Sequence, residues 1–384
     1  MATKTNSLKI GLVVDDTLDK TDGVQQYVLG IGAWLAQQGH DVHYLAGETA
    51  RKDLTNVHSL SKNIQVRFNG NHLSVPLPTS QRKIRQFLND QQFDVLHVQM
   101  PYSPFLAQRI ITAASPKTAV IGTFHILPNS KFVTFASRFL AVWLRKSLKR
   151  FDQIFSVSPA AQAFSKQIFK IDSDVLPNVF DYQLFHTAKS LPEYDDTIPT
   201  ILFLGRLVSR KGCGLLLEAV LALKQEHPDL SFRVIICGKG ALLESLQKFS
   251  EDHALTNIVE FAGFVNEADK PKYYASSKVT VFPSSGGESF GIVLLEAMAS
   301  GRAAVLAGDN PGYRSVMSQR PELLFDPTDP LALAAKLYEY LTNNELRKNA
   351  QNWGQDYVKA FDTPVVGQKL LKAYDKALRN RAEQ

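Results

Sequence analysis

The sequence predicts an α/β protein with two domains, each built on a parallel sheet that helices cover on both faces. Three observations support this prediction. The chain has 384 residues, more than one typical domain contains. Hydrophobic residues make up 45% of the chain and charged residues 21%, a balance typical of proteins with buried cores. Short β-branched runs alternate with longer amphipathic stretches, and this alternation starts again near residue 200.

The first half of the chain contains short apolar runs typical of buried strands, at 9–14, 41–45, 94–98, 119–123 and 153–157. Between them, apolar residues recur with helical spacing over 23–38, 103–114, 132–149 and 159–169. Gly39 is expected to end the first of these helices. We therefore expect a first domain at 1–185.

The second half repeats the pattern, with strands expected at 200–204, 233–237, 258–261, 279–282 and 303–306. Helices are expected at 215–223, 241–249, 270–275 and 291–300. A segment rich in Asp, Pro and Ser at 186–200 is the expected linker, which gives a second domain at 186–360. The charged helix expected at 363–382 is followed by no strand, so we expect the segment 361–384 to return to the first domain.

Cysteine content and the N-terminal residues point to a cytoplasmic protein. Only Cys213 and Cys237 occur, so no disulfide framework is implied and a reducing compartment is expected. Residues 1–7 are polar and lack the apolar core of a signal peptide. No run of 18 apolar residues predicts a membrane-spanning helix.

Positive charge is concentrated in the first half of the chain. Residues 1–185 contain 20 Lys and Arg against 13 Asp and Glu, whereas the remainder is nearly balanced. Such a surplus is compatible with nucleic acid, an anionic membrane or a phosphorylated ligand as partner, and charge alone does not choose among them.

The strongest functional signal is the glycine-rich stretch 286–296, between an expected strand and an expected helix. Glycines let a ligand approach the backbone, and free N–H groups at a helix start attract anions. Glu288 lies in the loop and Glu296 about two helical turns later, so both carboxylates can address one ligand. The alternative is a helix-start acid and a solvated helix residue, but the apolar stretch 290–295 disfavours solvent around Glu296.

A second signal is the cluster of cations in 205–212, directly after the expected strand 200–204. Arg206 and Arg210 offer planar forks for phosphate oxygens, and Lys211 offers a compact charge. Together they can hold a diphosphate and stabilise the charge that develops as it leaves. A solvated basic turn is the alternative.

Weaker signals lie in the first half. His125 ends an expected strand and can donate to a hydroxyl or a phosphate, although a lone histidine there is more often structural. Gly23 opens an expected helix and offers an amide to an anion, although it can equally be a turn residue. The chain lacks a GxGxxG after its first strand, a GxxxxGK[ST] loop and a Cys/His cluster with metal-ligand spacing, so no metal is expected.

These residues together resemble the retaining glycosyltransferases of family 4, which have the GT-B fold of two Rossmann-like domains facing a central cleft. The resemblance spans nearly the whole chain, at 22–23, 93–97, 123–125, 177–178, 205–212 and 288–296. Val24-Gln25, 287–294 and the Pro-Gly-Tyr-Arg stretch 311–314 are most similar to bacterial phosphatidylinositol mannosyltransferases.

The resemblance implies a nucleotide-sugar donor held mainly by the second domain and an acceptor held mainly by the first. It implies that Arg206 and Lys211 bind the diphosphate, with Arg210 beside them. It implies that Glu288 binds the donor sugar, that Glu296 binds the ribose, and that the backbone at Phe290, Gly291 and Ile292 contacts the donor. In the first domain it implies a donor-sugar contact at His125, a phosphate contact at Gly23 and an acceptor contact at Gln25. It implies no metal and no cofactor beyond a donor of the GDP or UDP type.

Two positions depart from the family's pattern. Asp22 replaces the first glycine of a Gly-Gly pair, which places a negative charge where a phosphate would approach. The stretch 177–181 reads Pro-Asn-Val-Phe-Asp where the family has Pro-Asn-Gly-Val-Asp, so the backbone of that loop is expected to differ.

The segment 131–150 contains six basic residues and no acid. Lys131, Arg138 and Arg145 recur every seventh position, and apolar surface comes from Phe132, Phe135, Phe139, Val142 and Trp143. This composition suits a helix on an anionic membrane, or equally a core-packed helix with a solvated outer face. The resemblance to lipid-modifying enzymes favours the membrane, and with it a peripheral location on the inner face of the plasma membrane.

The sequence thus predicts a hexosyltransferase that acts, with retention, on a lipid or glycolipid acceptor, with mannose as a possible sugar. Other readings stay open: a soluble or polysaccharide acceptor, and a sugar-nucleotide epimerase of the same architecture. A basic nucleic-acid-binding protein is the non-enzymatic alternative, and it leaves Glu288 and Glu296 unexplained; we therefore expect no nucleic acid as partner.

Overall fold

The computed structural model describes residues 7–20, 22–68, 71–125 and 131–383, with the side chains of 65–68, 71–75 and 131–136 left out. The chain forms two compact units. The first comprises Met1–Val179 and Thr363–Gln384, and the second comprises Phe180–Asp362. The chain therefore leaves the first unit, builds the second, and returns to the first with its last helix.

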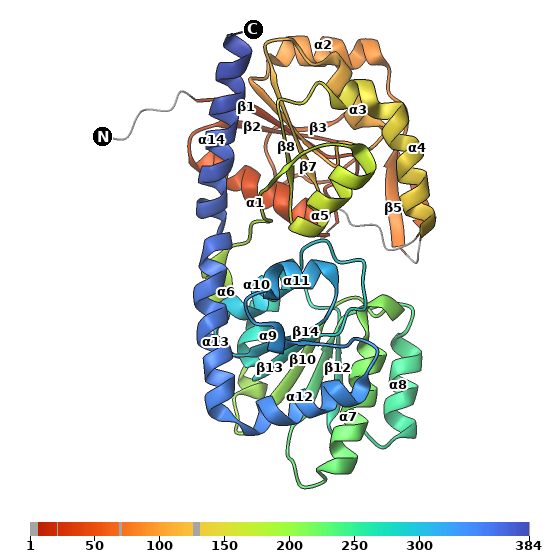
Figure 1. The fold of residues 1–384 in the computed structure, drawn as a ribbon, viewed down its shortest axis with the longest axis vertical. Coiled ribbons are helices and arrows are strands. Elements are labelled where there is room, and N and C mark those ends of the chain that lie inside the picture. The colour runs from red at the N-terminus through yellow and green to blue at the C-terminus, as the bar shows by residue number, and fades with distance from the viewer. Residues whose placement is uncertain (1–6, 21, 69–70, 126–130, 384) are drawn as a thin grey trace, which may run out of the picture. The chain divides into compact units, whose positions relative to one another are not determined.

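The first unit contains a sheet with the strand order β3-β2-β1-β6-β7-β8-β9, in which neighbouring strands run parallel (Figure 1). Its strands are β1 (Lys9–Val13), β2 (Asp41–Ala46), β3 (Val57–Ser59), β6 (Val95–Gln99), β7 (Ala119–Phe124), β8 (Gln153–Ser156) and β9 (Asp174–Val175). A separate antiparallel hairpin pairs β4 (Asn63–Phe68) with β5 (Asn71–Pro76).

The helices of the first unit are α1 (Gly23–Gln37), α2 (Gln81–Gln91), α3 (Leu106–Ala113), α4 (Lys131–Leu148), α5 (Pro159–Phe164) and α14 (Thr363–Ala382). The helix expected at 159–169 divides into α5 and a π-helical turn, Ser165–Phe169. Ser158 caps α5 by accepting a hydrogen bond from the Ala161 N–H at 3.1 Å.

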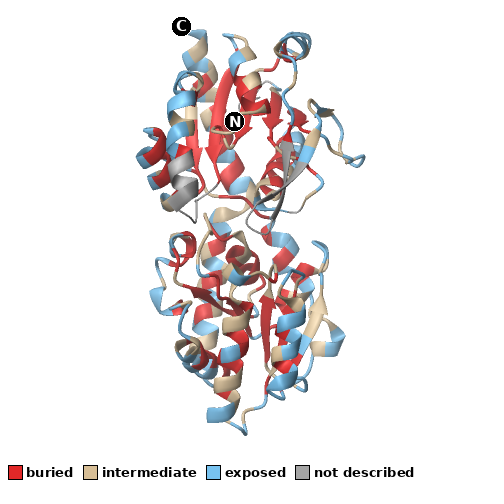
Figure 2. Ribbon diagram, turned by 90° about the vertical axis from the view of Figure 1, so that its right-hand side faces the viewer, coloured by how far each residue is buried: buried red, intermediate tan, exposed pale blue. Residues whose placement is uncertain are grey.

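Helix α14 completes the core of the first unit. Val366, Leu370 and Tyr374 are fully buried and belong to the same apolar cluster as α1 and the central strands. A Cβ on Gly367 would lie 2.5 Å from the Trp34 ring, so only glycine lets α14 approach α1 this closely. The central strands of both parallel sheets are largely buried (Figure 2), as expected for parallel sheets covered on both faces.

The second unit contains a parallel sheet with the order β12-β11-β10-β13-β14-β15. Its strands are β10 (Thr200–Leu204), β11 (Arg233–Cys237), β12 (Val259–Gly263), β13 (Val279–Phe282), β14 (Ala304–Gly308) and β15 (Leu324–Phe325). Its helices are α6 (Tyr182–His186), α7 (Cys213–Glu226), α8 (Leu243–Asp252), α9 (Lys270–Ser276), α10 (Ile292–Ala299), α11 (Pro311–Met317), α12 (Pro330–Thr342) and α13 (Asn344–Val358).

The first boundary between the units follows Val179, so the expected boundary at 185/186 falls inside the second unit. Helix α6 packs against α9 and α10, and its Phe185 ring lies 5.9 Å from the Tyr274 ring. The expected linker at 186–200 also belongs to the second unit, because the Leu191 N–H donates to the Ser276 hydroxyl at 2.9 Å. These tertiary contacts fix a segment whose composition resembles that of a linker.

Candidate active site

The strand order of the second sheet places two predicted motif loops next to each other. The order reverses between β10 and β13, which pair directly although β11 and β12 separate them in sequence. Ligands of open parallel sheets bind beyond the carboxyl ends of the strands at such a reversal point. The cation-rich loop 205–212 leaves β10 there, and the glycine-rich loop 283–291 leaves β13 there.

The two loops are in direct contact. Gly212 has φ 73°, and a Cβ on it would lie 2.1 Å from the Pro283 carbonyl oxygen, so only glycine fits. The Ser285 N–H donates to the Arg210 carbonyl at 3.0 Å, and the Ser284 hydroxyl lies 3.0 Å from the same oxygen. The backbone of one loop therefore fixes the other.

Glu288 is the centre of a compact ion cluster between these loops. Its Oε1 lies 2.7 Å from Arg210 Nη1 and 2.8 Å from Lys211 Nζ. The Ser284 hydroxyl also lies 3.0 Å from this oxygen, and its single hydrogen can be donated there, to the Arg210 carbonyl oxygen or to the Gly286 carbonyl oxygen at 3.3 Å. Burial favours the neutral acid, but Lys211 and Arg210 outweigh it and lower the pKa of Glu288. One carboxylate thus neutralises part of the charge of two cations.

Glu296 occupies a second, separate cluster. It lies in α10, is 3% exposed, and its two oxygens lie 3.3 and 3.4 Å from Lys270 Nζ. The Tyr274 hydroxyl donates to the same carboxylate at 3.2 Å, and Glu267 contacts Lys270 at 2.6 Å. Burial raises the pKa of Glu296, with Lys270 opposing. Glu296 is therefore not a solvated helix residue.

Four residues of these clusters were missed by sequence reasoning: Glu267, Lys270, Tyr274 and Ser284. Lys270 and Tyr274 are four residues apart at the start of α9, so their side chains share a face of that helix. That spacing was the available signal. Ser284 is the second residue after β13 and lies in the Pro-Ser-Ser run before the glycines.

Three glycines near Glu288 have a backbone or steric reason to be glycine, namely Gly287, Gly291 and Gly312. Gly287 has φ 71°, and Gly291, which precedes α10, has φ 105°. A Cβ on Gly291 would lie 2.7 Å from the Tyr313 ring, and one on Gly312 would lie 2.0 Å from the Glu288 carbonyl oxygen. The first residues of α11 therefore pack directly on the Glu288 backbone.

The remaining predicted residues of the second unit lie in the same two loops or at the start of α10. Arg206 follows β10 and is partly exposed. Phe290 is 3% exposed, and its ring lies 5.8 Å from Phe361. Gly291 and Ile292 form the start of α10, where backbone N–H groups lack helical partners.

His125 lies in the first unit, directly after β7, and is buried. Its Nε2 lies 2.7 Å from Gln99 Oε1, and the Tyr27 ring lies 5.0 Å from its own in an edge-on arrangement. Burial lowers the pKa of His125 to about 3, so the imidazole is neutral at physiological pH. Gln99 and Tyr27 belong to no motif that marks them as site residues in the sequence.

Gly23 and Gln25 lie in the first turn of α1. A Cβ on Gly23 would meet no atom within 4 Å, so no contact of the described chain requires glycine there. Gln25 is 2% exposed, and its Nε2 donates to the Thr17 carbonyl at 3.1 Å. In this structure Gln25 thus fixes the loop between β1 and α1.

Helix α4 presents large apolar side chains to solvent. Phe139 is 78% exposed, Val142 77% and Trp143 66%, whereas Leu144 and Leu148 are buried. Arg138 and Arg145 are exposed in the same segment. Lys131, Phe132 and Phe135 belong to the predicted surface, but their side chains lie outside the described part of the structure. Within that part, no helix combines the length and apolar character that crossing a membrane requires.

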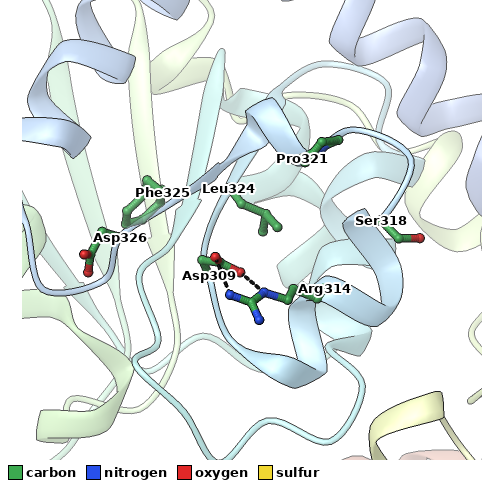
Figure 3. Close-up of a pocket in the computed structure, with 7 residues that line it drawn as sticks. All are labelled: Asp309, Arg314, Ser318, Pro321, Leu324, Phe325 and Asp326. Atoms are coloured by element: carbon green, nitrogen blue, oxygen red, sulfur yellow. Dashed lines mark hydrogen bonds and ion pairs between the residues drawn. The ribbon is translucent and has the colours of Figure 1, made fainter.

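A pocket of about 390 Å³ opens beside β14 and β15. In Figure 3, Asp309 and Arg314 point toward each other and form an ion pair, with Arg314 Nη2 lying 2.7 Å from Asp309 Oδ2. None of the predicted site residues lines this pocket. Among the side chains that the structure describes, no group of His, Cys, Asp or Glu is arranged to hold a metal ion.

Comparison with known proteins identifies the class. Residues 21–184 match the model "Glycosyltransferase Family 4", and residues 189–356 match "Glycosyl transferases group 1". A phosphatidyl-myo-inositol mannosyltransferase of Mycolicibacterium smegmatis is 31% identical over 372 residues, which covers 96% of this chain and 94% of that protein.

Solved structures show the same fold. A glycosyltransferase of Rickettsia africae has a TM-score of 0.79 at 21% identity, over 98% of this chain and 100% of that one. The Anabaena protein HepE, solved with UDP and glucose, has a TM-score of 0.68 at 16% identity, over 96% of this chain and 99% of that one. The chain belongs to the family-4 glycosyltransferases and has their GT-B fold.

Proposed function

We propose that this glycosyltransferase transfers a hexose, with mannose as the first candidate, from a nucleotide-diphosphate sugar to a lipid or glycolipid acceptor. The observation that carries the donor assignment is the cluster of Arg210, Lys211 and Glu288 at the reversal point of the second sheet. The acceptor and sugar assignments rest on the relatives named phosphatidyl-myo-inositol mannosyltransferase, such as that of Mycolicibacterium smegmatis.

The donor roles follow the chemistry of each side chain. Arg206 and Lys211 bind the diphosphate, and Arg210 supplies a further positive charge beside them. Glu288 accepts hydrogen bonds from the donor sugar. Glu296 accepts hydrogen bonds from the ribose hydroxyls. Its ion pair with Lys270 holds the carboxylate in place for this contact. The amides at Phe290, Gly291 and Ile292 face the donor as the free N–H groups of a helix start.

In the first unit, His125 contacts the donor sugar, the Gly23 amide approaches the phosphates and Gln25 contacts the acceptor. Binding of the acceptor by Gln25 requires its side chain to leave the Thr17 carbonyl or to use its other amide atom. A neutral His125 suits hydrogen bonding to a sugar hydroxyl.

Transfer with retention proceeds on one face of the sugar. The acceptor hydroxyl oxygen forms a bond to the anomeric carbon as the bond from that carbon to the phosphate oxygen breaks. The electron pair and negative charge leave with the diphosphate, which also takes the hydroxyl proton. Arg206 and Lys211 stabilise that charge without a metal or further cofactor, and exclusion of water strengthens the effect.

A panel of nucleotide sugars tests the donor assignment. Thermal unfolding is measured with GDP-mannose, UDP-glucose and UDP-N-acetylglucosamine, since a ligand that binds the native state raises the midpoint by mass action. Product analysis with and without a chelator then reports acceptor, anomeric configuration and metal dependence. Isomerised sugar without an acceptor would instead indicate an epimerase, and no stabilisation by any nucleotide sugar would contradict the donor site.

The apolar and basic surface of α4 supports the lipid acceptor. We propose that Phe139, Val142 and Trp143 insert at an anionic membrane surface, with Arg138 and Arg145 contacting lipid headgroups. This would place the enzyme peripherally on the inner face of the plasma membrane.

Liposome sedimentation tests this surface. Binding should require anionic lipid, weaken with salt, and fall when Phe139 and Trp143 are changed to Ser. The matched control is Leu331→Ser, which removes an apolar side chain that is 67% exposed in the other unit. Equal binding to neutral vesicles, or no binding, would favour a soluble or polysaccharide acceptor. Strong salt-dependent binding to DNA or RNA would favour the nucleic-acid alternative.

A further inference from the structure

Four buried polar side chains lie close to His125 in the core of the first unit. His97, Gln99, Thr123 and Tyr374 are each 0% exposed. Burying a polar group lowers the stability of the folded state unless that group is hydrogen-bonded. An apolar residue would fill the same space without this requirement. Their presence in the core of a sheet therefore calls for a reason beyond packing.

His97 is held from both sides. Its Nδ1 lies 2.7 Å from the Tyr374 hydroxyl and its Nε2 lies 2.7 Å from the Thr123 hydroxyl. A neutral imidazole has one N–H donor and one acceptor, and a hydroxyl can complement either. Burial, with a smaller contribution from His125, lowers the pKa of His97 to about 3. The ring is neutral, and its orientation is fixed by two hydroxyls.

Gln99 and Tyr27 connect the surroundings of His97 to His125: Gln99 Nε2 donates to the His97 backbone carbonyl at 3.4 Å, and the Tyr27 ring contacts both imidazoles. Gln99 lies two residues after His97 on β6, so both side chains are on the same face of the sheet, and Gln99 Oε1 lies 2.7 Å from His125 Nε2. The Tyr27 ring lies edge-on to both imidazoles, with its centroid 6.3 Å from that of His97 and 5.0 Å from that of His125. A tilt of His97 would therefore displace Tyr27 and the packing around His125.

Tyr374 comes from the other end of the chain, 277 residues from His97 in sequence. It lies in α14, whose close approach to the core is fixed by Gly367 against Trp34. The helix therefore brings one hydroxyl to a defined place beside His97.

We propose that Tyr374 is a positioning residue for His125: its hydroxyl fixes His97, which together with Gln99 and Tyr27 sets the orientation of the His125 imidazole. The inference rests on the proposed contact between His125 and the donor sugar. It makes the C-terminal helix a part of the catalytic arrangement as well as of the core.

Tyr374→Phe tests the inference, because it removes one oxygen and keeps the ring. We expect kcat to fall about ten- to a hundredfold, as for a misplaced contact, with the donor KM within about twofold of wild type. Tyr340→Phe is the control, since Tyr340 is a buried helical tyrosine of the other unit, 1% exposed. It should leave kcat unchanged even if it lowers the melting temperature. Thr123→Val, which removes the other hydroxyl beside His97, should act in the same direction as Tyr374→Phe.

A double-mutant cycle separates positioning from general destabilisation. If Tyr374 acts through His125, Tyr374→Phe should have no further effect on kcat in a His125→Ala background. The imidazole ¹⁵N shifts of His125 should also change in Tyr374→Phe, which reports orientation independently of turnover. If the losses of kcat from Tyr374→Phe and His125→Ala add, or if Tyr374→Phe leaves both the His125 shifts and kcat at wild-type values, this inference is wrong while the proposed role of His125 stands. Wild-type kcat in His125→Ala would overturn the proposed role of His125, and this inference with it.

Discussion

At the scale of single residues, the ion clusters of the second unit depend on charges that are partly removed from water. Glu288 is 13% exposed in its side chain and Lys211 17%, so each depends on the other for its hydrogen bonds. Removing one member of such a pair leaves the other uncompensated, which costs more than loss of the attraction alone. The cluster therefore stabilises the contact between the two loops, and its two cations exceed its one carboxylate by a single positive charge.

We expect Lys211→Ala to lower turnover by about 10²–10³-fold, the usual effect of losing one preorganised group that stabilises developing charge. Steady-state kinetics with the best donor measure this loss. Lys248→Ala is the control, because Lys248 is an exposed lysine of the same unit, 72% exposed in its side chain. Wild-type turnover in Lys211→Ala would rule out the proposed stabilisation of the diphosphate.

Asp15 gives a second prediction at this scale. Its carboxylate follows β1, is 6% exposed, and accepts hydrogen bonds from the Ala107 N–H at 2.6 Å and from the Ser103 hydroxyl. Burial raises the pKa of Asp15 from 3.8 to about 7. The native state therefore holds this proton more tightly than the unfolded state, and the contribution of Asp15 to stability declines as the pH rises from 3.8 to 7.

Asp15→Asn should consequently stabilise the protein at pH 8 and have a smaller effect at pH 5. The amide keeps an acceptor for the Ala107 N–H and removes the cost of a buried charge, which is about 1.4 kcal/mol per pKa unit. Chemical denaturation at the two pH values measures the difference. Equal effects at both would show that Asp15 does not titrate in this range.

At the scale of elements, α1 and α10 each have a glycine at their start, Gly23 and Gly291, but the structural reason for glycine differs between the two positions. At Gly291 the conformation itself demands it, because φ is 105° and the Tyr313 ring occupies the place of a Cβ. At Gly23 no described atom occupies that place. The described chain therefore leaves room at the start of α1 for the phosphate that we propose there.

Gly23→Ala separates binding from folding. We expect its stability to match or exceed that of wild type by about 0.4–1 kcal/mol, because alanine restricts the unfolded chain. The donor KM should nevertheless rise, since a methyl group would stand between the amide and the phosphate. Gly291→Ala is the contrasting variant and should lower the melting temperature. An unchanged donor KM in Gly23→Ala would argue against phosphate binding at α1.

At the scale of the whole molecule, the first unit has a core that is sensitive to acid. Burial lowers the pKa of both His97 and His125 from 6.5 to about 3. The unfolded chain therefore binds these protons first, and the stability contributed by the neutral rings is lost as the pH falls from 6.5 toward 3. Burial of His40 and His58 lowers their pKa values in the same direction.

We expect the free energy of unfolding of the first unit to fall between pH 6.5 and pH 4. Near pH 5 the two histidines favour the unfolded chain and Asp15 opposes them, a net difference of about one proton, so these three groups should give a slope of about 1.4 kcal/mol per pH unit there. Burial also raises the pKa of Asp16, which opposes the histidines in the same way as Asp15. Denaturation followed by the fluorescence of buried Trp34 measures the slope. Asp15→Asn should make the slope steeper, and a flat profile would show that the histidines are not buried as neutral rings.

The elements of the fold were largely predictable because they depend on local sequence. The alternation of strand and helix and the loops at the carboxyl ends of strands were predicted from apolar spacing. Short strands such as β9 and β15 were not predicted, since two residues carry no periodic signal. Helices α2, α6, α11 and α12 were also missed, although at the start of α12 the Asp329 side chain accepts hydrogen bonds from two backbone N–H groups.

By itself, the sequence determined the α/β class, the family and the candidate residues, because each depends on short motifs and local patterns. Only the tertiary structure decided which of these residues meet. The pairing of β10 with β13 brings Arg210 and Lys211 to Glu288, although 78 residues separate Arg210 from Glu288 in sequence. Helix α9 brings Lys270 to Glu296. The return of α14 likewise brings Tyr374 to His97. Such contacts follow from strand order and helix packing, and no local propensity encodes them.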